Sequence, residues 1–112
     1  MSRFDYQTVV RGPVALVTLR GEMDMHACAD LEPELDRLFD EGRIDVIALD
    51  LRALEFLDSS GLRTLVVTRN RLEEEDRRLV LVRGPQAVQR VFEITRMTER
   101  LEFVDTPEHV HT

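Results

Sequence analysis

The chain has 112 residues and a mass of 13.0 kDa, which suits one ordinary domain that needs no disulfide or metal to stabilise it. Its formal net charge of −7 argues against direct binding to nucleic acid or to an anionic membrane surface, because both require a basic protein face. All 15 basic residues are arginine, which excludes chemistry that depends on a lysine. The sequence has neither the apolar core of a signal peptide nor an apolar run of about 20 residues, so we expect a soluble cytoplasmic protein.

Two runs rich in apolar and β-branched residues, at 6–10 and 14–19, predict two strands near the N-terminus. The Gly-Pro pair between them, at 12–13, is typical of a turn, so the strands should form a hairpin. We expect Gly21 to end the second strand and residues 21–24 to form a loop.

A helix is predicted next, because apolar residues recur there at helical spacing. Pro33 limits where this helix can begin, since a proline inside a helix removes a hydrogen-bond donor. With Asp30 as the N-cap, Pro33 would fall in the first turn, where it is tolerated. Gly42 is a typical C-terminal stop. The apolar face consists of Leu31, Leu35, Leu38 and Phe39.

The rest of the chain alternates strands and helices. The pattern predicts a strand covered on both faces at 44–51, a helix at 62–72, a strand at 79–82, a helix that begins at Pro85, and a last strand at 101–104. The order β-β-α-β-α-β-α-β predicts a single α/β domain over 1–112, with a core at about 4–104 and a polar C-terminal tail at 105–112. Its sheet should be mixed and mostly parallel, with the first strand antiparallel.

Three predicted loops should lie at one edge of this sheet, because the carboxyl ends of parallel strands meet there. They carry Asp24, the pair Asp58-Ser59, and Gly84. This is the edge at which α/β folds usually place their sites, so it is where we look for function.

The turn Asp58-Ser59-Ser60-Gly61 has the most unusual local sequence. A purely structural role is available, since one Asp or Ser side chain caps the following helix. A cap uses one side chain, so a serine hydroxyl would remain exposed at the positive end of a helix dipole. A phosphoryl group there would be stabilised by free N–H groups and would add about −1.5 to −2 charges beside Asp58.

Other chemistry lacks partners in this sequence. The Gly-x-Ser-x-Gly pattern of a hydrolase is absent, and His26 is the one histidine outside the C-terminal tail that could approach Ser59. Cys28 cannot form an internal disulfide and is interpreted as a small buried apolar residue. No metal site or resident cofactor is expected, and the chain is not expected to be an enzyme.

The segment Leu57-Asp58-Ser59-Ser60-Gly61-Leu62 resembles the signature of the STAS domain of bacterial anti-sigma factor antagonists. The segment 21–24, Gly-Glu-Met-Asp, is similar to that family's Gly-Glu-hydrophobic-Asp loop, and the strand at 79–82 with the helix after Pro85 matches the later part of its pattern. The resemblance covers about residues 6–104 and implies a single STAS-like α/β domain.

The resemblance implies a regulatory switch. In that family a serine kinase, which is also the anti-sigma factor, phosphorylates the first serine of the turn, here Ser59. The unphosphorylated antagonist binds the kinase, with ATP in the kinase, and so releases a sigma factor that activates transcription; a serine phosphatase reverses the modification. The partner-binding residues implied here are Asp24, Asp58, Ser59, Ser60 and Gly61.

Some alternatives stay open at this point. Asp58 either orients Ser59 or caps the helix. Arg63 stands where close family members often have a small residue, which leaves the identity of the partner open. The chain would be a monomer or a weak dimer. The alternative function is a constitutive STAS binding module of a membrane transporter complex, which needs no phosphate.

Overall fold

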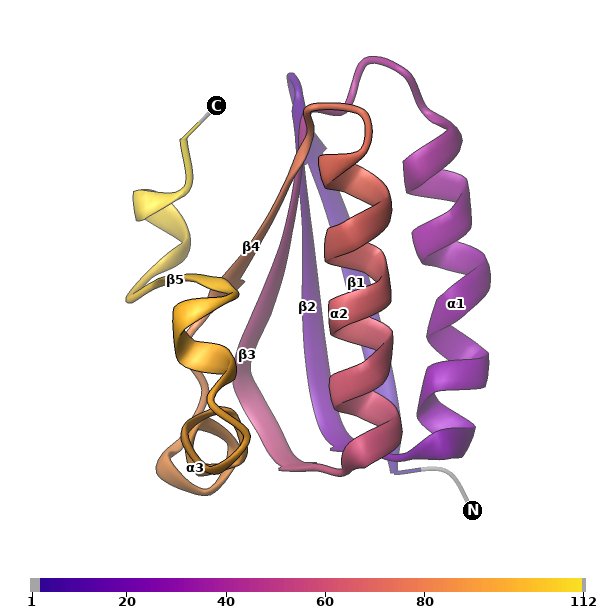
Figure 1. Cartoon of the computed structure of the whole chain (residues 1–112). Helices are drawn as coiled ribbons and strands as arrows, with labels where there is room; N and C mark the ends of the chain where they lie inside the picture. The colour runs from indigo at the N-terminus through magenta and orange to yellow at the C-terminus, as the bar shows by residue number, and fades with distance from the viewer. Residues whose placement is uncertain (1–2, 112) are drawn as a thin grey trace.

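The computed structural model describes residues 3–111, in which five strands, three α-helices and two short 3-10 helices follow one another (Figure 1). The elements are β1 (Phe4–Arg11), β2 (Val14–Met23), α1 (Met25–Asp40), β3 (Val46–Leu57), α2 (Ser59–Glu73), β4 (Arg78–Val82), α3 (Gln86–Ile94), η1 (Met97–Glu99), β5 (Glu102–Val104) and η2 (Pro107–His109). Along residues 3–111, no helix combines the length and the apolarity that crossing a bilayer requires.

The strands form one sheet in the order β1-β2-β3-β4-β5. β1 pairs with β2 in antiparallel fashion, and the other neighbours are parallel. This confirms the predicted α/β class, the N-terminal hairpin and the order of elements. Right-handed crossovers that all advance in one direction across a sheet place their helices on the same face. Figure 1 shows α1 and α2 side by side along this face.

The core lies between the sheet and the three helices. Ile47, Leu49 and Leu51 alternate along β3 and belong to one buried cluster with apolar residues of all three helices. From α3, the buried ring of Phe92 packs edge-to-face against Phe103 of β5, with ring centroids 5.1 Å apart. The sheet and all three helices therefore share a single core.

The second strand is longer than predicted. Gly21 does not end β2, which continues to Met23, so the predicted loop at 21–24 is mostly strand. Gly21 has φ +94°, and a Cβ there would collide with the carbonyl oxygen of Arg3 at the start of the hairpin. The register of β2 against β3 shifts on both sides of Gly21. This glycine therefore marks an irregularity inside a strand and not its end.

The first helix begins six residues earlier than predicted. Its N-cap is Asp24, not Asp30, and Pro33 lies inside the helix. The proline is tolerated because it is exposed, as is Ala29, whose carbonyl would otherwise accept the missing N–H and is left open to water. The early turns bury only the small residues Ala27 and Cys28, which explains why large apolar residues did not mark them. The helix ends at Asp40, two residues before Gly42.

Other elements also begin or end at different residues than predicted. β3 runs six residues beyond the predicted 44–51 strand and brings its end directly to Asp58. α3 begins at Gln86, with Pro85 as its N-cap instead of its first residue. The predicted C-terminal tail contains η2.

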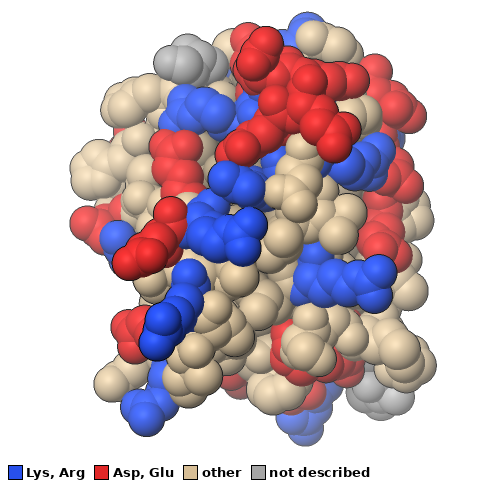
Figure 2. Space-filling view, in the orientation of Figure 1, with Lys and Arg blue, Asp and Glu red and all other residues tan. Residues whose placement is uncertain are grey.

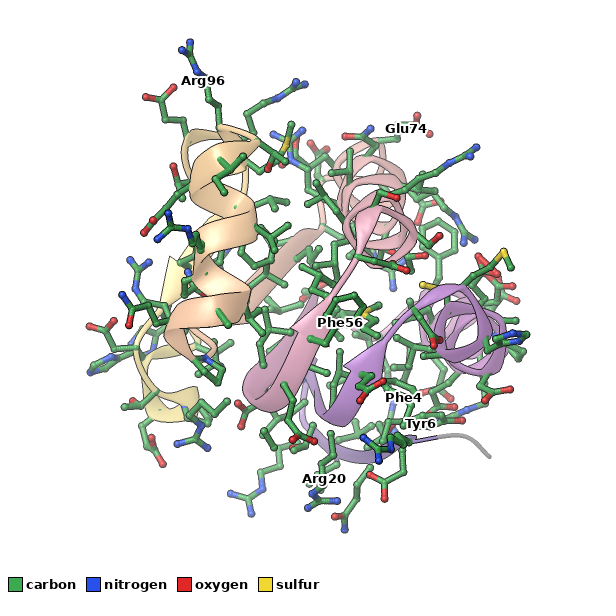
Figure 3. The ribbon with its side chains drawn as sticks, turned by 90° about the horizontal axis from the view of Figure 1, so that it is seen from below. Phe4, Tyr6, Arg20, Phe56, Glu74 and Arg96 are labelled. Carbon is green, nitrogen blue, oxygen red and sulfur yellow. The ribbon has the colours of Figure 1, made fainter. Side chains whose placement is uncertain are left out.

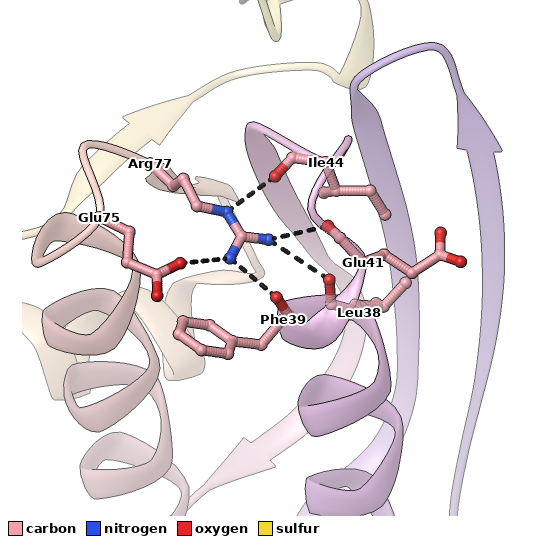
Figure 4. Close-up of polar contacts among 6 residues, drawn as sticks. All are labelled: Leu38, Phe39, Glu41, Ile44, Glu75 and Arg77. Carbon is pink, nitrogen blue, oxygen red and sulfur yellow. Dashed lines mark hydrogen bonds and ion pairs between the residues drawn. The ribbon is translucent and has the colours of Figure 1, made fainter.

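Arg77, a buried arginine just before β4, holds the end of α1 (Figure 4). Its guanidinium donates hydrogen bonds of 2.8 Å to the carbonyls of Phe39 and Ile44, and of 3.4 Å to those of Leu38 and Glu41. Leu38 and Phe39 lie in the last turn of α1 and Glu41 is its C-cap, where a helix end leaves acceptors without intrahelical partners. Arg77 therefore fixes the end of α1 opposite to the predicted site.

Candidate functional site

Each of the first two helices begins with an aspartate that caps it. Asp24 Oδ1 accepts a hydrogen bond of 2.9 Å from the N–H of Ala27, and Asp58 Oδ1 accepts one of 3.0 Å from the N–H of Gly61. Both aspartates have extended backbone, as N-caps usually do. Asp58 is therefore a helix cap, which is one of the two roles that the sequence left open for it.

The two caps are neighbours because the strands before them end together. Met23, the last residue of β2, is paired in register with Leu57, the last residue of β3. The N–H of Asp58 also donates a hydrogen bond of 3.3 Å to the carbonyl oxygen of Met23. The predicted meeting of the Asp24 and Asp58 turns at one sheet edge is confirmed.

The loop that carries Gly84 does not lie beside the Asp24 and Asp58 turns. A Cβ at Gly84 would lie 2.8 Å from the carbonyl oxygen of Leu51, which places this loop beside the middle of β3. From Leu51 the strand continues six residues to Leu57, a distance of about 20 Å at the usual rise per residue. Only two of the three loops expected at this edge of the sheet therefore meet there, because β4 is much shorter than β3.

Gly61 allows the close approach of the second turn to the first. A Cβ on Gly61 would lie 2.9 Å from the carbonyl oxygen of Met23 and would collide with the side chain of Leu57. The first turn of α2 therefore rests directly on the ends of both strands. Gly61 acts by its small size and is buried, so it offers a partner no surface of its own.

The two serines differ in their surroundings. Ser59, the first residue of α2, is exposed, and its hydroxyl makes no hydrogen bond to any residue between 3 and 111. Ser60 is partly buried and lines a groove between α1 and α2, without capping the helix. Neither hydroxyl forms a hydrogen bond with residues 3–111, and that of Ser59 is the more exposed of the two.

The groove between α1 and α2 has a volume of about 600 Å³ and starts beside this turn. Cys28 and Thr64 contribute to its lining from facing helices, and Arg63 lies at its edge near Ser60. Burial raises the pKa of the Cys28 thiol, which agrees with the expected role of a small buried residue. His26 is exposed on the first turn of α1 and makes no hydrogen bond to Ser59.

Two large apolar side chains at this end of the molecule were missed by the sequence analysis. Met25 directly follows the Asp24 cap and is 65% exposed, and Phe56 lies two residues before Asp58 and is 48% exposed. Figure 3, which looks onto this end, shows Phe56 there. Exposed apolar residues next to a polar turn are typical of a protein-binding surface. The position of Met25 and Phe56 next to the predicted Asp24 and Asp58 turns is the sequence signal that could have identified them.

Charge is distributed unevenly along α2. Four consecutive acidic residues, 73–76, stand at its C-terminal end, and Figure 2 shows acidic side chains gathered most densely over that end of the molecule. The Ser59 turn lies at the opposite end, where Asp24 and Asp58 are each engaged in a cap.

Comparison with known proteins agrees with this fold. The STAS domain model matches residues 5–110. An anti-sigma-B factor antagonist of Staphylococcus epidermidis is 28% identical over 93 residues, which are 83% of this chain and 85% of the relative. The crystal structure of an anti-sigma factor antagonist from Mycobacterium paratuberculosis superposes with a TM-score of 0.84 at 24% identity, over 94% of this chain and 88% of that one.

A second solved structure is the Bacillus cell fate determinant SpoIIAA in its phosphorylated form, with a TM-score of 0.73 at 23% identity over 93% of this chain and 94% of that one. The relatives are named for antagonism of a regulatory factor and not for a catalysed reaction, in agreement with a non-enzymatic role. With a family match over nearly its whole length, the chain belongs to the STAS domain family.

Proposed function

We propose that this chain is an anti-sigma factor antagonist that acts as a phosphorylation-controlled switch between partners. Unphosphorylated, it would bind a serine kinase that also serves as the anti-sigma factor, and so release a sigma factor. The observation that carries this proposal is the Ser59 hydroxyl, exposed at the start of α2 while Asp58 already supplies the cap. The fold does not need this hydroxyl, which leaves it free for modification. The names of the similar antagonists support the general role.

In the proposed modification the Ser59 oxygen attacks the γ-phosphorus of ATP. An O–P bond forms to Ser59, the bond from the γ-phosphorus to the bridging oxygen breaks, and ADP leaves. The hydroxyl proton passes to a base of the kinase, which also holds ATP and Mg²⁺. A serine phosphatase would return Ser59 to the free hydroxyl by hydrolysis.

The phosphoryl group would act through charge and shape without unfolding α2. It adds about −1.5 to −2 charges at a helix N-terminus, where the first N–H groups have no intrahelical acceptor. It would also stand at the end of the molecule that carries Met25 and Phe56, two exposed apolar residues. A kinase surface that buries those side chains would then have to accommodate a dianion.

The proposal is tested by using the chain as bait in a lysate of its native host, with ATP or ADP added. Wild type, Ser59→Ala, Ser59→Asp and the matched control Ser60→Ala are compared. Retained proteins are identified, and phosphate on the bait is mapped by mass spectrometry. We expect a serine kinase on wild type, Ser59→Ala and Ser60→Ala but not on Ser59→Asp. Phosphate is expected at residue 59 in the wild-type and Ser60→Ala baits and in neither variant of Ser59.

Two results would contradict the proposal. One is a kinase held as tightly by Ser59→Asp as by wild type. The other is a membrane transport protein held equally by all four baits, with Ser59 unmodified. The second result would support the alternative function, in which the turn serves only to begin α2.

A further inference from the structure

Arg63 is a free cation one helical turn from Ser59. α2 carries three arginines, and two of them are paired: Arg69 with Glu73 at 2.9 Å and Arg71 with Asp36 at 2.7 Å. Arg63 is exposed and forms no ion pair or hydrogen bond with any residue of the described chain. It is therefore available to an anion that arrives later.

The helix places Arg63 and Ser59 on the same face. Residues four apart on an α-helix are surface neighbours, and an anion that precedes a cation by four residues is the more favourable order. Ser59 and Arg63 have this spacing and order, and both side chains are exposed. The long arginine side chain spans one turn without any change in the backbone.

We propose that Arg63 binds the phosphoryl group on Ser59 within the same chain, an inference that rests on the proposed phosphorylation. The planar guanidinium presents paired N–H donors that match two phosphate oxygens. Asp24 and Asp58 lie in neighbouring turns at the same edge of the sheet and would repel the new dianion. Arg63, on the groove beside Ser60, is a cation that would offset this repulsion.

The ion pair would also change the groove between α1 and α2. Ser60 and Arg63 both line the end of this groove nearest the turn. Once paired, the phosphoryl group would lie along the first turn of α2 at that end, and Arg63 would no longer be free to bind an acidic group of a partner. Phosphorylation would thus both block one end of the groove and pair the Arg63 cation that was free there.

The test uses full-length chain with phosphoserine inserted at position 59 during translation, so that no kinase is needed. The second pKa of the phosphate is measured by ³¹P NMR titration in the otherwise wild-type protein, in Arg63→Gln and in the matched control Arg69→Gln from the same helix. An exposed helical ion pair changes the proton affinity of the phosphate about twofold, so Arg63→Gln should raise its pKa by about 0.3. Arg69→Gln should leave the pKa unchanged.

Two further measurements sharpen the test. Arg63→Lys should keep part of the effect, because it retains the charge without the planar fork. The difference between wild type and Arg63→Gln should shrink in 1 M salt, where exposed charges are screened. Equal pKa values in the Arg63→Gln and wild-type proteins at low salt would overturn the proposal. This readout is independent of any kinase, so the mapping of phosphate in the host lysate decides the proposed function separately.

Discussion

The N–H of Asp58 donates a hydrogen bond of 3.3 Å to the carbonyl oxygen of Met23, which joins the turns from which α1 and α2 begin. The junction is made by backbone atoms and by two capping carboxylates. The exposed side chains around it, those of Ser59, Met25 and Phe56, are therefore not needed to hold it together. A surface of this kind can be modified or bound without loss of the fold.

Replacing the Asp58 cap should separate its structural role from a direct role in binding. Asp58→Ala should lower the free energy of unfolding by about 1 kcal/mol, because the N–H of Gly61 loses its acceptor, whereas Asp58→Asn should keep most of the stability. Urea unfolding measures both. If the side chain serves only as a cap, Asp58→Asn retains the kinase partner; loss of binding by a stable Asp58→Asn protein would show that the carboxylate contacts the partner.

Gly61 should not tolerate a side chain. Gly61→Ala should lower the free energy of unfolding by about 1–3 kcal/mol, because its Cβ would press against the Met23 carbonyl and the Leu57 side chain. The matched control is Gly42→Ala, where a Cβ meets no atom within 4 Å. Urea unfolding measures the free energy of unfolding of both variants. Equal stability of Gly61→Ala and Gly42→Ala would mean that the turn shifts to make room for a Cβ.

Arg77 should be among the most costly arginines to replace. Arg77→Met should lower the free energy of unfolding by about 3 kcal/mol, because it leaves the buried carbonyl of Ile44 and the half-buried carbonyl of Phe39 without their donor. Arg43→Met, which removes only an exposed contact of 3.5 Å to Glu41, should cost less than about 0.5 kcal/mol. Thermal or urea unfolding of both variants provides the comparison, and similar losses would refute the assigned role of Arg77.

Glu34 should make stability depend on pH. Hydrogen bonds from Arg37 and from Thr8, a residue of β1, lower the pKa of Glu34 below its ordinary 4.5, although partial burial opposes the shift. A lowered folded-state pKa means that the stabilisation is complete above about 4.5 and is lost as the pH falls through the folded-state pKa. Glu34→Gln should therefore be less stable than wild type at pH 7, with a gap that narrows toward pH 3. Unfolding at several pH values measures this gap.

The control for this experiment is Glu32→Gln. Glu32 is exposed and forms no ion pair among residues 3–111, so its replacement should change stability little at either pH. A gap between wild type and Glu34→Gln that stays constant from pH 7 to pH 3 would contradict the assigned pKa shift.

Features that depend on nearby residues were predictable. The alternation of strands and helices, the turn at Gly12 and the capping potential of Asp58 are all local patterns, and the structure confirms them. The meeting of Asp24 with Asp58 followed from strand direction alone, since parallel strands bring their carboxyl ends to one edge. Periodicity and polarity were thus enough for the fold class and for the meeting of the Asp24 and Asp58 turns.

Features that depend on contacts distant in sequence were not predictable. The start of α1 was missed because its early turns bury only Ala27 and Cys28, and because Pro33 is tolerated only by facing water. Arg77 looks like any other arginine until the fold brings it to the end of α1. The exposure of Met25 and Phe56 and the free state of Arg63 likewise depend on which neighbours the folded chain supplies. Sequence determined the order and direction of the elements through local propensity and periodicity, whereas burial, pairing and accessibility were decided by packing between segments far apart in the chain.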